Sequence, residues 1–109
     1  MLLNDKQYVE AARRLAERMM TEAGPTAAER AEFAFRIATS RKPTPGELAV
    51  LLKVYESELA EFQSDSEAAA KLLAYGAAKR NESLDANELA AWTLVANLVL
   101  NLDETVTKE

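Results

Sequence analysis

Residues 86–102 read ANELAAWTLVANLVLNL, and this stretch decides the fold of the chain. Apolar residues cover most of the circumference that a helix of this sequence would have, and they leave one narrow polar line at Thr93, Asn97 and Asn101. The stretch is shorter than the roughly 20 apolar residues that cross a bilayer, and the polar line interrupts it. The pattern therefore predicts a long helix at the centre of a soluble bundle, with neighbours on several sides.

Three residues of this helix are candidates for a structural or binding role. Trp92 is expected to be the principal core anchor, with an indole N–H that donates to a carbonyl rather than contributing to a ligand site. A buried Asn97 needs partners for its amide, so we expect it to fix the packing register through hydrogen bonds. The alternative is a ligand-binding role for Asn97, with Asn101 continuing the same polar line.

Capping sequences mark four helix starts. In a capping box, a Ser, Thr or Asp side chain accepts from a backbone N–H of the first turn, and a Glu three residues later reaches back. Asn4 is expected to cap a further helix before them. Together these signals predict an all-α fold, a compact bundle of about five helices, in a single domain over residues 1–109. The four boxes are Thr26 with Glu29, Thr44 with Glu47, Ser64 with Glu67, and Asp85 with Glu88.

Apolar spacing assigns a buried face to each of the first four helices. Gly24-Pro25 is expected to end the first, as a left-handed cap, and Gly76 the fourth, before a loop over residues 77–84. The predicted core residues are Tyr8, Ala12, Leu15, Ala16 and Met19 on the first helix, Phe33, Ala34, Ile37 and Ala38 on the second, Leu48, Leu51, Leu52, Tyr55 and Leu59 on the third, and Leu72 and Leu73 on the fourth. The residues expected to point mostly outward from the first helix are Arg13, Arg14, Glu17 and Arg18.

The composition excludes most familiar catalytic chemistry. The chain has no Cys and no His, so it has no thiol nucleophile, no imidazole base and none of the usual zinc or haem ligands. The densest acidic cluster away from the helix starts is Asp103-Glu104 with Glu109, and nothing in the sequence positions these carboxylates around a cation. We therefore expect no catalytic residue, no bound metal and no cofactor.

The charge distribution argues against nucleic acid as a partner. The net charge is −5, made up of +2 over residues 1–42 and −7 over residues 43–109. Arg41-Lys42 lies between two predicted helices, which superficially resembles a helix-turn-helix. The second of these helices carries one cation, Lys53, against several glutamates including Glu56 and Glu58, so it would repel phosphates. We predict that the chain binds no nucleic acid.

Three ordered blocks of sequence resemble the C-terminal portion of a planctomycete family of unknown function, whose large proteins often also contain a cytochrome-c-like region. The resemblance covers nearly the whole chain. It departs at Ser40, where the family tends to have glycine, and at Thr105, where an aromatic residue often stands. The blocks are Asn4-Asp5 with Tyr8-Val9-Glu10-Ala11-Ala12-Arg13 and Leu15-Ala16; Ala34-Phe35-Arg36 with Arg41-Lys42-Pro43-Thr44 and Glu47-Leu48; and Leu89-Ala90-Ala91-Trp92-Thr93 with Asn97-Leu98-Val99-Leu100-Asn101 and Asp103-Glu104.

The resemblance implies a fragment or stand-alone version of a C-terminal helical region that is normally attached to a larger extracytoplasmic protein. It carries over no catalytic residue, and a cytochrome-like region would need Cys and His. The first residues reach a carboxylate at Asp5, too early for the apolar segment of a secretory signal, so no signal peptide is expected in this chain.

Two functions from different classes are compatible with these observations. The preferred hypothesis is a non-enzymatic helical accessory or protein-interaction domain, whose partner is an upstream domain of the parent chain or a second copy of itself. The alternative is a small-molecule-binding or catalytic accessory module whose site needs upstream residues. That alternative requires polar groups such as Asn97 to converge in a pocket.

Overall fold

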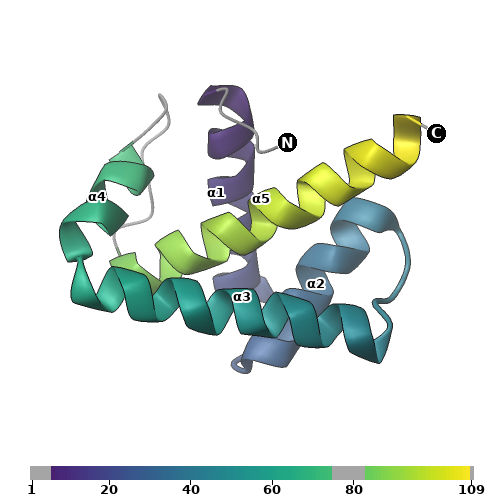
Figure 1. Cartoon of the computed structure of the whole chain (residues 1–109), viewed down its shortest axis with the longest axis horizontal. Coiled ribbons are helices and arrows are strands. Elements are labelled where there is room, and N and C mark those ends of the chain that lie inside the picture. The colour runs from purple at the N-terminus through teal and green to yellow at the C-terminus, as the bar shows by residue number, and fades with distance from the viewer. Residues whose placement is uncertain (1–5, 75–82, 109) are drawn as a thin grey trace.

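The computed structural model describes the backbone of residues 6–74 and 83–108, and the side chains of residues 10–74 and 83–101. These residues form five helices and no strand, which confirms the predicted all-α class (Figure 1). The helices are α1 (Lys6–Glu22), α2 (Ala27–Thr39), α3 (Pro45–Ser64), α4 (Ser66–Ala74) and α5 (Ala86–Lys108). Helix α5 continues beyond the predicted end at residue 102, because no glycine or proline follows to stop it.

Helix α5 is the central element, as the sequence predicted. It contacts each of the other four helices, and in Figure 1 it crosses the middle of the molecule, with α1 behind it, α3 below, and α4 and α2 to either side. The side chains of α5 from Ala86 to Asn101 are all buried or half-buried. Among the described residues, no helix combines the length and the apolar character that crossing a bilayer requires.

Two of the four predicted capping boxes are complete. Thr26 accepts from the Glu29 N–H, Thr44 accepts from the Glu47 N–H, and each glutamate accepts from the backbone N–H of its threonine. The Asp85 carboxylate accepts from the Glu88 N–H at 2.9 Å, so this start is also where the sequence placed it. These are interactions within four residues, which local sequence specifies directly.

The box predicted at Ser64 is wrong by one residue. Ser64 is the last residue of α3, where its hydroxyl donates to Ala60 O at 3.2 Å. The cap of α4 is Asp65, whose carboxylate accepts from the Ala68 N–H at 3.2 Å. Ser and Asp cap equally well, so the pattern could not choose between adjacent positions. Asn4, Gly76 and most of the predicted loop over 77–84 lie outside the described residues.

The turn between α1 and α2 has the geometry that Gly24-Pro25 predicted. Helix α1 ends at Glu22, and Gly24 has a φ of 115°, a conformation that side-chain-bearing residues rarely adopt. Arg30 donates from Nε to Gly24 O at 3.0 Å, and its Nη1 lies 3.7 Å from Glu88 Oε1. The arginine thereby ties this turn to the first turn of α5.

Arg13 is a correction to the predicted surface of α1. Only 2% of Arg13 is exposed, and its Nη1 donates to Leu73 O at 2.9 Å. That carbonyl lies in the last turn of α4, where carbonyls have no donor within the helix, so a cation there satisfies an acceptor and opposes the negative helix end. Helical spacing alone assigned Arg13 outward because its partner is 60 residues away.

Candidate interaction surface

The polar line of α5 is satisfied largely by the helix itself. The Thr93 hydroxyl donates to Leu89 O at 2.7 Å, and Asn101 Nδ2 donates to Asn97 O at 3.0 Å. Thr93 is buried and Asn101 is half-buried. These bonds to the preceding turn are a common way for a helix to carry hydroxyl and amide groups into a core.

Trp92 and Asn97 are both buried, but their polar atoms differ from the prediction. No part of Trp92 is exposed, and its ring stacks on that of Tyr55 with centroids 3.8 Å apart and planes at 12°. The predicted hydrogen bond from the indole to a carbonyl is not found among the described residues, where Nε1 has no partner. Asn97 is 8% exposed, and its Oδ1 likewise has no partner within the described part of the chain.

No described hollow gathers these predicted residues into a site. Three hollows lined by described residues have volumes of about 380, 240 and 210 Å³, and Trp92, Asn97 and Asn101 line none of the three. The described residues also contain no group of three or more acidic side chains that could hold one metal ion. The three candidates from the sequence therefore lie in or at the edge of the core.

Two of the hollows lie next to each other on the outer side of α2. The larger, of about 380 Å³, is lined by Phe33, Arg36, Ile37 and Ser40. The hollow of about 210 Å³ shares Phe33 and Arg36 and continues toward the α1–α2 turn. We call this the α2 outer surface; its residues are Ala23, Glu29, Glu32, Phe33, Arg36, Ile37 and Ser40.

In the structure, α2 is rotated relative to the predicted orientation, and this rotation turns the α2 outer surface toward solvent. The sequence placed Phe33 and Ile37 in the core, but Ile37 is 43% exposed and Phe33 is only half-buried. The fully buried residues of α2 are Ala31, Ala34 and Phe35. Successive helical residues are turned by about 100°, so the buried face and the outer surface are on opposite sides of α2.

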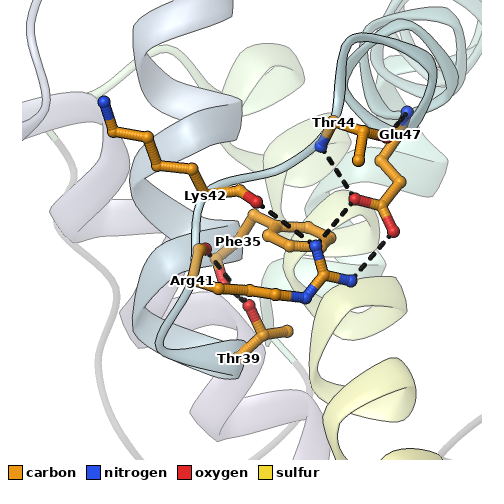
Figure 2. A network of polar contacts seen from close by, with 6 residues as sticks. All are labelled: Phe35, Thr39, Arg41, Lys42, Thr44 and Glu47. Atoms are coloured by element: carbon orange, nitrogen blue, oxygen red, sulfur yellow. Dashed lines mark hydrogen bonds and ion pairs between the residues drawn. The ribbon is translucent and has the colours of Figure 1, made fainter.

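The connection to α3 explains this rotation (Figure 2). The Arg41 guanidinium carbon lies over the Phe35 ring, 4.8 Å from its centroid, and only 1% of Phe35 is exposed. Arg41 also donates to both carboxylate oxygens of Glu47, at 3.0 and 2.9 Å. Because Glu47 is already held by the cap of α3, the arginine links the end of α2 to the start of α3 with Phe35 facing inward.

The same network sets the ionisation of Glu47. The hydrogen bonds from Arg41, and after them the bond from the Thr44 N–H, lower the pKa of Glu47 to about 2. Between the two helices, Ser40 takes a left-handed conformation with a φ of 64°, and its N–H donates to Arg36 O at 2.8 Å. This left-handed helix end favours glycine, and Ser40 is the position at which the planctomycete family that the sequence resembles tends to have glycine.

The charged groups of the α2 outer surface are arranged beside its apolar residues. The side chains of Glu32 and Arg36 have no ion-pair partner among the described residues. Arg18 of α1 lies over Phe33, with its guanidinium carbon 5.4 Å from the ring centroid, and pairs with Glu22. An apolar pair flanked by unpaired charges of both signs is the composition of a polar-rimmed protein contact.

The third hollow is on the exposed side of α3. It has a volume of about 240 Å³ and is lined by Val50, Lys53, Val54, Ser57 and Glu58. Val50 is 57% exposed and, with Ile37, is one of the two large hydrophobic residues exposed among the described residues. The apolar residues of this hollow are two valines, where the larger hollow on α2 has an aromatic ring and an isoleucine.

Sequence reasoning missed the α2 outer surface for an identifiable reason. Residues 31–38 place apolar side chains on two sides of the helix, one with Phe33 and Ile37 and the other with Ala34 and Phe35. The predicted face joined Phe33 and Ile37 to Ala34 and Ala38: Ala34 is buried and Ala38 packs against the core, whereas Ile37 is exposed. A helix with more apolar residues than one face can hold is itself a signal of a second contact surface.

A family model described as "PSD1: Protein of unknown function (DUF1553)" matches residues 1–55 of the chain. No curated protein and no solved structure matches it. The matched residues include α1, α2 and the first part of α3, so they contain the α2 outer surface and the Arg41–Glu47 link. Helices α4 and α5 lie outside the match.

Proposed function

We propose that this chain, which belongs to the PSD1 family of proteins of unknown function by the match over residues 1–55, is a non-enzymatic helical accessory or protein-interaction domain. In this proposal it contacts another protein through the α2 outer surface. The observation that carries this proposal is the exposure of Ile37 beside Phe33 on a helix whose other face is already buried. Exposed apolar side chains gathered on one face are a common mark of a contact surface.

The rest of the surface fits a protein partner better than a small molecule. The hollows run along one helix and share Phe33 and Arg36. Their apolar centre and charged edge match the arrangement of protein–protein contacts, in which apolar residues exclude water and charges at the rim select the partner. The alternative, a small-molecule or catalytic accessory module, needs Asn97 in a pocket, and no described hollow offers it.

We propose no catalytic role for the domain. The chain lacks His and Cys, and the described glutamates with defined contacts hold helix starts and ion pairs. We also propose that it does not bind nucleic acid, given the net charge of −5. Salt-sensitive retention of duplex DNA by micromolar protein would contradict this.

The family context extends the proposal to the partner. We propose from the resemblance that the domain belongs to a larger extracytoplasmic planctomycete protein, and that its contact is with an upstream domain of the parent chain or with a second copy. With either partner, the residues that make the contact are those of the α2 outer surface.

Site-specific photo-crosslinking tests the proposed function. A photoreactive phenylalanine analogue is placed at position 37, and a matched control carries it at Glu56, an exposed position on α3 outside the hollows. In extracts of cells that produce the protein, position 37 should give defined crosslinked protein products, and position 56 should not. Equal or absent crosslinking at the two positions would contradict the proposal.

A further inference from the structure

We propose that the α2 outer surface is the contact of a two-fold dimer, in which α2 of a second copy packs antiparallel against α2. This inference rests on the proposed function and names the partner. In the dimer, Glu32 of each copy faces Arg36 of the other, and Phe33 of each copy packs against Ile37 of the other. The argument comes from the order in which these four side chains lie around the helix.

The four side chains form two edges of one face. At about 100° per residue, Glu32, Arg36, Phe33 and Ile37 follow each other around α2 within an arc of about 140°. Glu32 and Arg36 make a charged edge, and Phe33 and Ile37 make an apolar edge. Ser40 lies between the edges, where its small side chain permits a close approach.

A two-fold axis brings each edge against its own counterpart. The axis relating two antiparallel, side-by-side helices is perpendicular to both, so the charged edge of one copy lies next to the charged edge of the other. With the axis level with the middle of residues 33–36, Glu32 of one copy stands within one residue, about 1.5 Å of helix rise, of the height of Arg36 in the second. The same register places Phe33 within one residue of the height of Ile37, an offset that the side chains can span.

The charges select a second copy because the surface complements itself. A two-fold contact requires each patch to carry both members of every pair, and Glu32 and Arg36 supply one charge of each sign one turn apart. Neither has an ion-pair partner among the described residues, so both are available to the second copy. A head-to-tail contact between α2 of one copy and the α3 hollow of the next would pair two different surfaces, and such contacts build rings or filaments.

Sedimentation of the full chain over a range of concentrations tests the dimer. The wild type should change from monomer to dimer as concentration rises, and Ile37→Asp should remain monomeric. The matched control is Val50→Asp, which puts the same charge at the other exposed large hydrophobic residue and should dimerise like the wild type. Circular dichroism checks that each variant is folded.

A charge exchange tests the register. Glu32→Arg and Arg36→Glu should each raise the dimer dissociation constant by about tenfold or more. In either variant the side chains at positions 32 and 36 carry like charges, and the two-fold axis places two such repulsive contacts in each dimer. An equimolar mixture of these two variants should recover dimerisation, since every contact then joins opposite charges. An intramolecular role for Glu32 and Arg36 would give no such recovery on mixing.

Three results would overturn the proposal. The first is a wild type that stays monomeric up to roughly millimolar concentration, where even weak specific contacts form. The second is a dimer lost in Val50→Asp but kept in Ile37→Asp, and the third is no recovery of dimerisation in the mixture of the two charge variants. These results are separable from the proposed function. If position 37 crosslinks a different protein in cell extracts while the pure chain stays monomeric, the contact surface stands and only the second copy is wrong. Crosslinked products at twice the mass of the chain support the dimer.

Discussion

Arg41 donates hydrogen bonds to both carboxylate oxygens of Glu47, at 3.0 and 2.9 Å, across the turn that joins α2 to α3. The glutamate is at the same time the third residue of α3 and the reciprocal partner of its cap. One ion pair therefore connects a local capping motif to the packing of Phe35, and so to the face that α2 shows to solvent.

The pH dependence of stability should depend on Glu47. Its pKa is about 2 in the folded protein, against an ordinary value of 4.5, so its ionised form stabilises the fold above pH 4.5. This contribution is lost as the pH falls from about 4.5 toward 2. Glu47→Gln should lower the melting temperature at pH 7, and the difference from wild type should shrink over that range.

Thermal unfolding monitored at a series of pH values measures this effect. The matched control is Glu61→Gln, at an exposed position on the same helix. Because the Arg41–Glu47 pair is itself solvent-exposed, added salt should reduce the Glu47→Gln effect. A difference that stays constant between pH 7 and pH 2 would contradict the assigned contact.

Trp92→Ala should come close to unfolding the protein. The side chain is fully buried on the central helix and stacks on Tyr55, and truncating a buried aromatic costs about 3–5 kcal/mol of the roughly 5–15 kcal/mol that stabilises a domain. Lys53→Ala, on the exposed side of α3, should change the free energy of unfolding by less than about 0.5 kcal/mol. Chemical denaturation followed by circular dichroism compares the two.

Arg13→Ala should be far more damaging than the same change at the next residue. It removes a buried side chain and the donor to Leu73 O, for an expected loss of about 2–4 kcal/mol. Arg14 is exposed on the same helix, so Arg14→Ala should cost less than about 0.5 kcal/mol. Similar denaturation midpoints for the two variants would place Arg13 on the surface.

Ser40→Gly should stabilise the protein, by up to about 1 kcal/mol, because glycine adopts the left-handed conformation of this helix end without steric strain. The same substitution within a helix should have the opposite sign. Ser57→Gly, in the exposed middle of α3, should destabilise by about 0.5–1 kcal/mol. Melting temperatures of the two variants on opposite sides of the wild type are the expected result.

The sequence by itself determined the features that depend on neighbours along the chain. The caps at Thr26 and Thr44 join residues three apart, and the apolar circumference of 86–102 demands a central helix in any compact arrangement. Such features follow from helical geometry and hydrogen-bonding capacity alone. The adjacent candidates Ser64 and Asp65 show the limit of local reasoning, since either residue could cap the helix.

Only the tertiary structure decided what depends on residues far apart. Leu73 O draws Arg13 into the core from 60 residues away, although helical spacing places that arginine outside. Helix α2 has apolar residues on two sides, so either side could face the core. In the structure Phe35 faces the core with the Arg41 guanidinium over its ring, and Ile37 is left exposed. The physical reason is common to both: a helix can satisfy its spacing pattern in more than one orientation, and partners on other helices determine which orientation buries the most surface and satisfies the polar groups.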